Sequence, residues 1–283
     1  MSGGAPGGKP AGLSNLQTRV LSSIVMIAAA LALTYAGGWA FRLLAAGIAA
    51  AMFYEWAAMS RTPANAGFQL AVGGLLAVTL IALVAGAEAA AVFILAGAGV
   101  AIAAAAGALL GHGRSAAAGL AYAAFSAIAL AFLRGNDPSG LSAILFLFAV
   151  VWATDILAYF AGRAIGGPRL APAISPGKTW SGAIAGAVAG VLAGLAAAAL
   201  LAQSLSAGIA AVALLLSVVS QIGDLFESAV KRRHGAKDSG ALIPGHGGVL
   251  DRVDGLVAAA MALYAIGWLA AGPDSPAQGL FPN

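Results

Sequence analysis

The sequence predicts an all-α, polytopic integral membrane protein with about nine transmembrane helices. Of its 283 residues, 61% are hydrophobic and only 8% are charged, whereas charged residues make up about a quarter of an ordinary soluble domain. So few charges cannot cover the surface of a soluble domain this large, so lipid must be the solvent for most of the chain. The apolar residues also gather into long segments, each near the roughly 20 residues that a helix needs to cross a bilayer.

The first predicted helix follows a short tail. Residues 1–14 are rich in Gly and Pro, a composition typical of disorder, and residues 15–283 are expected to form a single multi-span membrane domain. Lys9 and Arg19 precede the first apolar run, as in a signal peptide. The run is as long as a span and more spans follow, which favours an uncleaved helix. The expected spans are 20–36, 39–57, 69–86, 90–110, 116–133, 141–161, 180–201, 207–228 and 252–271.

The distribution of basic residues predicts the orientation of these spans. If the N-terminus is cytoplasmic, only Arg42 and Arg134 of the 14 Lys and Arg lie outside, as the positive-inside rule requires. The polar loops 162–179 and 229–251 then face the cytoplasm, and the C-terminus lies outside. We therefore expect a multi-pass protein of the inner (plasma) membrane with a site that faces the cytoplasm.

Four glycines predict close helix packing in the seventh span. Gly182, Gly186, Gly190 and Gly194 recur every four residues, which leaves one helix face flat enough for a neighbouring helix to approach closely. The chain also has no cysteine, which excludes disulfides, thiolate zinc sites and cysteine nucleophiles.

The segment between 221 and 255 is the strongest candidate for a functional site. It holds 12 of the 27 ionisable side chains in the chain. Ionisable groups are costly in a bilayer, so a cluster at the ends of apolar helices indicates function before packing.

The end of the eighth span places three polar groups on one helical face. Asp224, Ser228 and Lys231 lie at i, i+4 and i+7. Mg²⁺ prefers carboxylates, water and substrate phosphates, and Lys and Arg pair with phosphates. Alternatively, Lys231 and Arg232 are membrane-surface anchors.

The loop that follows adds further candidates. Lys237 and Asp238 precede a stretch with several glycines, and glycine loops with free amide groups can cradle phosphates. His246 could serve as a base or as a donor to phosphate, or it could be hydrogen-bonded for structure alone.

Two carboxylates open the ninth span. Asp251 and Asp254 are three residues apart and share a helical face. Carboxylates are favourable at a helix N-terminus, so simple capping would explain them. Combined with Asp224 across a helix interface, they would instead form a divalent-metal site. Arg252 between them is a candidate phosphate ligand.

A second polar cluster precedes the seventh span. Asp155 lies inside the sixth span, where an unpaired carboxylate would cost on the order of 3 kcal/mol, and Arg163 is a candidate partner two helical turns away. Ser175, Lys178 and Thr179 could contact phosphate or nucleotide, although the P-loop spacing is absent. A helix start with its cap would be an alternative explanation.

At these residues the sequence resembles the phosphatidate cytidylyltransferase (CDP-diacylglycerol synthase) family. The family's long signature matches at Ser228, Lys231, Arg232, Lys237, Asp238, Gly240, Pro244, Gly245, His246, Gly247, Gly248, Asp251, Arg252 and Asp254. Its second segment matches at Asp155, Ala158, Tyr159, Gly162, Arg163, Ser175, Pro176, Lys178, Thr179, Trp180 and Gly182. Ser181 stands where the family usually has Glu, which puts a role for this position in doubt.

The resemblance implies the reaction of CTP with phosphatidate to give CDP-diacylglycerol and pyrophosphate. It also implies dependence on Mg²⁺, with a second cation nearby, and it carries the family's metal-binding aspartates over to Asp224 and Asp251. Asp254 is expected to support them. Because the phosphatidate phosphate is already an anionic nucleophile, the main task is to neutralise charge on two polyanions. The remaining expectations are phosphate binding by Lys231, Arg232, Lys237 and Arg252, and contacts to CTP or the lipid head group from Ser175, Lys178 and Thr179.

Two other functions compete with this one. The chain could transfer a cytidylyl or phosphoryl group to another lipid, such as a polyprenol. It could also be a transporter, because polar residues inside spans mark transport paths, but its charges gather at one membrane face instead of along the midplane. We expect no nucleic acid partner, and a homodimer is compatible with the sequence.

Overall fold

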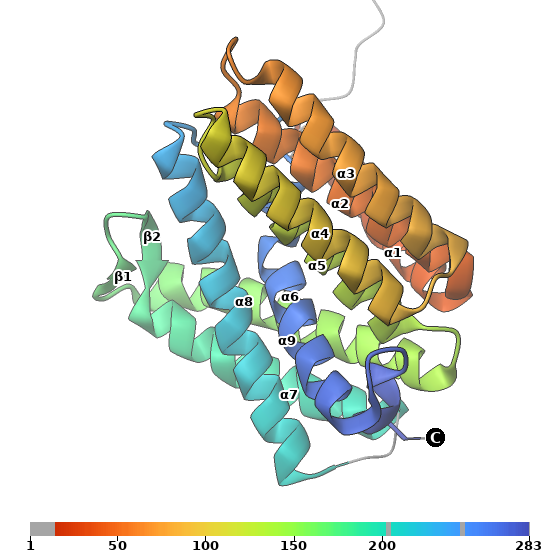
Figure 1. Cartoon of the computed structure of the whole chain (residues 1–283). Coiled ribbons are helices and arrows are strands. Elements are labelled where there is room, and N and C mark those ends of the chain that lie inside the picture. The colour runs from red at the N-terminus through yellow and green to blue at the C-terminus, as the bar shows by residue number, and fades with distance from the viewer. Residues whose placement is uncertain (1–14, 202–204, 244–246, 283) are drawn as a thin grey trace, which may run out of the picture.

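The chain folds into a bundle of helices whose bounds follow the apolar segments (Figure 1). The computed structural model describes residues 15–201, 205–243 and 247–282. Within these ranges it has nine α-helices, one two-stranded hairpin and a 3₁₀ turn. They are α1 Asn15–Ala36, α2 Gly38–Ser60, α3 Ala66–Ala85, α4 Ala89–Leu109, α5 Ser115–Arg134, α6 Pro138–Ile165, β1 Arg169–Ala171, β2 Ser175–Thr179, α7 Trp180–Leu201, α8 Ala207–Arg233, α9 Leu250–Ala271 and η1 Pro276–Gly279.

The helices confirm the predicted fold class. Each predicted span corresponds to one helix, and in the described part of the chain α2 to α9 are long and apolar enough to cross a membrane. In α1 the apolar part is shorter and covers Val20–Ala36. The chain is therefore an all-α, multi-pass membrane protein. The tail predicted at 1–14 lies outside the described residues.

Two helices run further than the sequence indicated. The loop predicted at 162–179 starts with the last residues of α6, and the loop predicted at 229–251 starts with the last turn of α8 and ends with the first turn of α9. Lys231, Arg232 and Arg233 occupy the last turn of α8, where positive charge complements the helix dipole. The basic residues thus extend the helix instead of ending it.

An all-helical prediction did not contain the hairpin that precedes α7. β1 and β2 pair antiparallel, with Arg169 opposite Thr179 and Ala171 opposite Ser175. β2 leads directly into α7, and the Trp180 backbone N–H donates to the Pro168 carbonyl at 3.0 Å. The polar residues before α7 are therefore held in a defined strand.

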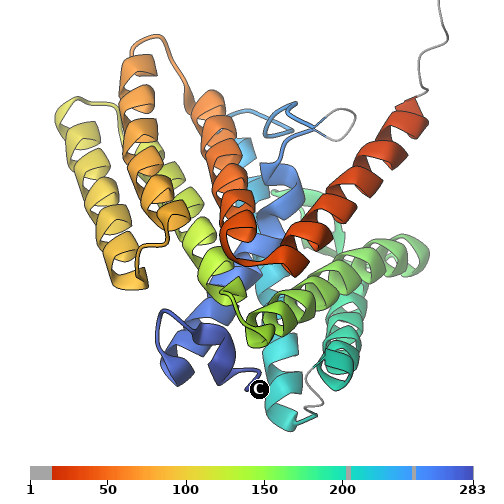
Figure 2. The ribbon, with the colours of Figure 1, turned by 90° about the vertical axis from the view of Figure 1, so that its right-hand side faces the viewer.

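Helix α5 forms the centre of the bundle. Nearly all of its residues are buried, and it packs against α2, α3, α4 and α9. Helix α1 contacts only α2 and α6 substantially, and Figure 2 shows it leaning away from the other helices toward its N-terminal end.

The glycine face of α7 packs as predicted. A Cβ atom on Gly186 would lie 2.8 Å from the Thr154 carbonyl oxygen on α6, and one on Gly194 would lie 2.9 Å from Ala213 Cβ on α8. At the same level the Thr154 and Ser217 hydroxyls are 2.7 Å apart. The glycines thus let α6, α7 and α8 converge, which brings the polar ends of these helices together.

This packing predicts the effect of a single methyl group. Gly186→Ala should lower the free energy of unfolding by about 1–3 kcal/mol, because an overpacked contact forces backbone shifts. The measurement is unfolding in detergent. Gly97→Ala on α4 is the matched control, since its Cβ would meet no atom within 4 Å. Equal stability of the two variants would contradict the close packing of α6 and α7.

Candidate active site

The two polar segments meet in one cavity of about 930 Å³. It lies where the ends of α6, α7, α8 and α9 and the hairpin converge. Helix α6 contributes Asp155 and Arg163, and the hairpin contributes Lys178. The predicted site residues that line the cavity are Asp155, Arg163, Ser175, Lys178, Thr179, Asp224, Lys231, Asp238, Asp251, Arg252 and Asp254.

One wall of the cavity is acidic and is balanced by a lysine from the hairpin. Asp155, Asp224 and Asp254 come from three different helices and interact electrostatically with one another. The Lys178 ammonium forms an ion pair with Asp224 and also interacts with Asp155. The cation close to Asp155 is thus Lys178, whereas the Arg163 guanidinium approaches the Tyr159 hydroxyl at 3.5 Å.

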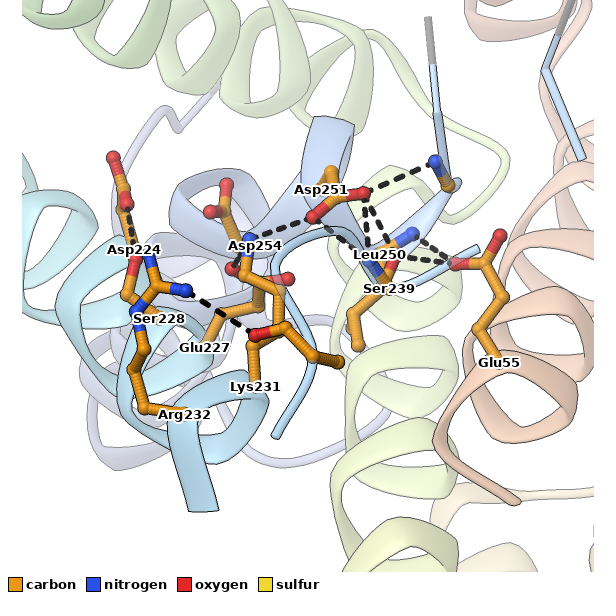
Figure 3. A network of polar contacts seen from close by, with 12 residues as sticks. Glu55, Asp224, Glu227, Ser228, Lys231, Arg232, Ser239, Leu250, Asp251 and Asp254 are labelled. Carbon is orange, nitrogen blue, oxygen red and sulfur yellow. Dashed lines mark hydrogen bonds and ion pairs between the residues drawn. The ribbon is translucent and has the colours of Figure 1, made fainter. Parts of the chain in front are cut away.

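Asp251 is held by several hydrogen bonds from α8 and from the loop before α9 (Figure 3). Its Oδ1 accepts a hydrogen bond from Lys231 Nζ at 2.7 Å. Its Oδ2 accepts from the Ser239 N–H at 3.0 Å, the Ser239 hydroxyl at 2.9 Å and the Gly248 N–H at 3.0 Å. Asp251 therefore fixes both the cavity-lining lysine and the loop before α9.

The Lys231 ammonium lies between two carboxylates. Besides Asp251, it contacts Glu227 Oε2 at 2.6 Å, one helical turn earlier on α8. The Glu227 side chain is 1% exposed and the Lys231 side chain 13% exposed. Two acids from neighbouring helices thus share one ammonium group, which ties the end of α8 to the start of α9.

Neither aspartate of α9 is a simple helix cap. Asp251 accepts hydrogen bonds from residues that precede the helix, and Asp254 Oδ1 accepts from the N–H of the next residue, Gly255, at 2.7 Å. A capping side chain would instead accept from an N–H two or three residues further on. The cap of α9 comes from another helix.

That cap is Glu55 on α2, which the sequence reasoning missed. Its carboxylate accepts from the N–H groups of Val249 at 2.9 Å and Leu250 at 2.8 Å and from the Ser239 hydroxyl at 3.0 Å. Glu55 is 1% exposed. The sequence does contain a signal for Glu55, because it lies inside the predicted span 39–57 and a carboxylate inside an apolar span needs a partner. The same argument was applied to Asp155.

Two loop glycines make room for Glu55. A Cβ on Gly240 would lie 2.8 Å from its Oε1, and one on Gly248 would lie 2.6 Å from its Oε2. At these two positions the loop approaches a protein carboxylate, not an open ligand surface. Gly247 has a φ of +84°, which favours glycine.

Other predicted site residues lie away from the cavity lining. The Ser228 hydroxyl approaches Asp224 Oδ1 at 3.5 Å, and the exposed Arg232 guanidinium donates to the Ala236 carbonyl at 3.3 Å. Lys237 is exposed and does not line the cavity. His246 lies outside the described residues.

The hairpin residues combine structural and cavity-lining roles. The Thr179 hydroxyl accepts from the Gly182 N–H at 3.2 Å, so Thr179 caps α7. This agrees with the alternative explanation of the segment as a helix start with its cap. The Ser181 hydroxyl donates to the Gly166 carbonyl. Ser181 therefore ties the start of α7 to the end of α6, whereas Lys178 faces the acidic wall.

The fold and the site define a class of protein. A polar cavity with carboxylates, lysines and arginines at one end of a membrane helix bundle suits an enzyme that handles phosphate groups at the membrane surface. The family model described as "Cytidylyltransferase family" matches residues 17–270. The chain belongs to the cytidylyltransferase family.

Similar proteins carry a more specific name. A "Phosphatidate cytidylyltransferase" of Brucella suis is 54% identical over 271 residues, which cover 95% of this chain and 99% of that protein. A protein of the same name from Brucella abortus is 54% identical over 264 residues, 93% of this chain and 97% of that protein. One from Pseudomonas aeruginosa is 50% identical over 131 residues, 44% of this chain and 48% of that protein.

The geometry predicts different structural effects for two aspartates. Asp251→Asn should lower the free energy of unfolding by about 1–3 kcal/mol, because buried donors lose their acceptor. Asp224→Asn should lower it by less than about 1 kcal/mol, because a partly exposed ion pair such as Lys178–Asp224 contributes little. Unfolding of both variants in detergent measures the difference. An equal loss of stability would contradict the network around Asp251.

Proposed function

We propose that the chain transfers the cytidylyl group of CTP to phosphatidate and releases pyrophosphate. The observation that carries this proposal is the cavity, which places cationic and acidic groups at the end of membrane helices. A nucleotide from water and a phosphate on a lipid can both reach such a place. The names of the Brucella proteins, similar along nearly the whole chain, support the same reaction.

The reaction needs charge neutralisation more than a strong base. A phosphatidate oxygen attacks the α-phosphorus of CTP, the new P–O bond forms, and the bond to the β-phosphate oxygen breaks, so that pyrophosphate leaves. Both reactants are polyanions, and positioned cations lower the cost of their approach. Lys178, Lys231, Arg163 and Arg252 line the cavity and are proposed to bind these phosphates.

Mg²⁺ fits the acidic wall of the cavity. Among the described residues, no three acidic or histidine side chains already form a metal site. Mg²⁺ needs only one or two carboxylates, because it keeps waters and binds substrate phosphates. Asp224 and Asp254 face the cavity and are proposed to hold it. When bound, the ion supplies positive charge to the α-phosphate and the leaving pyrophosphate.

Asp251 has a different position in this scheme. Its carboxylate already accepts hydrogen bonds from Lys231, Ser239 and Gly248, so it would bind a metal only by giving up one of them. Its metal role therefore stays a prediction, as does the second cation. Substitution of Asp251 disturbs the loop as well as the charge, which makes Asp224 the cleaner test of metal binding.

We also propose that the cavity faces the cytoplasm of a bacterial inner membrane. The connections α2–α3, α4–α5, α6–α7 and α8–α9 are every second connection of the bundle. Together with the helix ends next to them, they carry most of the basic residues. Figure 1 shows the C-terminus at the end of the bundle opposite the α8–α9 connection. This distribution is the one that the positive-inside rule requires.

Substitution of Asp224 tests the proposed chemistry. Asp224→Asn should lower the rate of pyrophosphate release by at least ~10², about 2.7 kcal/mol of transition-state stabilisation, because the metal loses a charged ligand. The assay uses purified protein, CTP and phosphatidate across a Mg²⁺ titration. Asp274→Asn is the control, since Asp274 caps Ala89 at 2.8 Å far from the cavity and Asn keeps an acceptor. A near-normal rate for Asp224→Asn, or full turnover in excess chelator, would refute the metal site.

Labelling of single cysteines tests the orientation, since the chain has no cysteine of its own. A membrane-impermeant thiol reagent added to intact cells should label Pro282→Cys and leave Ala64→Cys and Ala241→Cys unlabelled. All three positions are exposed, so access to the thiol depends on the side of the membrane. After permeabilisation all three should react. Labelling of Ala241→Cys in intact cells would place the cavity outside.

A further inference from the structure

Glu55 is a buried carboxylate far in sequence from the cavity residues, yet it is hydrogen-bonded to the loop that they share. Its donors in the described chain are the N–H groups of Val249 and Leu250 and the hydroxyl of Ser239. It does not line the cavity. Figure 3 shows it reaching from α2 toward the start of α9, on the side of Asp251 away from Asp224.

Ser239 connects Glu55 to Asp251. Its hydroxyl lies 3.0 Å from Glu55 Oε2 and 2.9 Å from Asp251 Oδ2. A hydroxyl has one hydrogen, so the two carboxylates share it and their positions depend on each other. The Ser239 side chain is almost completely buried, at 3% exposure, which keeps water from replacing this contact.

Asp251 in turn binds a cation that lines the cavity. Its second oxygen, Oδ1, holds Lys231 Nζ at 2.7 Å. The sequence of contacts therefore runs from Glu55 through Ser239 and Asp251 to Lys231. Only the last two residues line the cavity.

The surrounding glycines show that the loop is fitted to Glu55. Any side chain at Gly240 or Gly248 would collide with this carboxylate, as the Cβ distances of 2.8 Å and 2.6 Å show. Helix α2 otherwise packs mainly against α3 and α5. Glu55 is thus a point at which helix α2 directly contacts both the loop and the α9 N-terminus.

We propose that Glu55 is a positioning residue for cytidylyl transfer. It holds the loop and the first turn of α9 so that Asp251 keeps Lys231 at the cavity wall. This inference rests on the proposed function. The chemistry also explains why a carboxylate is needed, since Glu55 accepts on both oxygens and no neutral side chain of the same shape can do so.

Glu55→Gln is the first test, because it keeps the shape and replaces one acceptor with an NH₂ group that faces a donor. Misplacement of a binding group by about 1 Å can cost ~10²-fold in rate. We expect kcat/KM for CTP to fall at least ~10-fold, mainly through a higher KM, if Lys231 binds CTP phosphate. Glu88→Gln is the matched control, since Glu88 is exposed and belongs to a different pocket.

Ser239→Ala separates positioning from general stability. It removes the bridge to Asp251 and leaves the cap of α9 by Glu55 intact. Because Glu55 acts through Ser239, the double variant should lose little more activity than Glu55→Gln alone, whereas independent effects would add. Fully additive losses, or an unchanged KM for CTP in both single variants, would overturn the positioning role. If Glu55→Gln does not fold, the KM of Ser239→Ala still decides.

Hydrogen exchange provides a readout that does not depend on activity. Peptides that cover residues 236–252 should exchange faster in Glu55→Gln than in wild type, and Glu88→Gln should leave them unchanged. Unchanged exchange in a folded Glu55→Gln variant would overturn the inference. Lack of pyrophosphate release by the wild-type protein would instead contradict the proposed function, and the exchange experiment would still test the role of Glu55.

Discussion

The Lys231 ammonium between Glu227 and Asp251 is the interaction on which the site depends. A charge taken out of water costs several kcal/mol unless it is paired and hydrogen-bonded. Here the lysine contacts the buried Glu227 on its own helix at 2.6 Å and Asp251 on α9 at 2.7 Å. These contacts fix the distance between α8 and α9 at the cavity. The loop that joins the two helices must then adapt to Asp251.

The adaptation explains why the loop has so many hydrogen bonds to carboxylates. Ser239 and Gly248 satisfy Asp251, and Glu55 satisfies the α9 N-terminus. A helix N-terminus favours negative charge, and in this bundle a distant helix supplies it. The N-terminal helices therefore support the site mechanically, while the last four helices and the hairpin form its cavity.

The sequence predicted those features that depend on local composition and on residues that recur at helical spacing. The nine helices follow from runs of apolar residues, and the α7 face follows from glycines every four residues. Both polar segments were recognised because charge is rare elsewhere in the chain. The two polar loops were predicted on the same side of the membrane, next to one site, and the structure brings residues from both into one cavity.

The remainder depends on contacts that are distant in sequence. Glu55 could have been recognised as a carboxylate inside an apolar span, but its partners at the start of α9 are nearly two hundred residues away and could not be predicted. Arg232 was expected to bind phosphate because it matches the family signature, but α8 continues to Arg233 and the Arg232 guanidinium donates to the Ala236 carbonyl. The hairpin was missed because its two strands are too short to show the alternation of apolar and polar residues that indicates a strand.

The central claim is that one cavity, ordered by the Lys231 network, holds both the nucleotide and its metal. The most direct test is an experimental structure of the protein with Mg²⁺ and a non-hydrolysable CTP analogue. We predict the triphosphate against Lys178 and Lys231, the ion at Asp224, and Asp251 still in contact with Lys231 and Ser239. A nucleotide bound outside the cavity, or one that leaves Lys231 without a phosphate contact, would contradict the account.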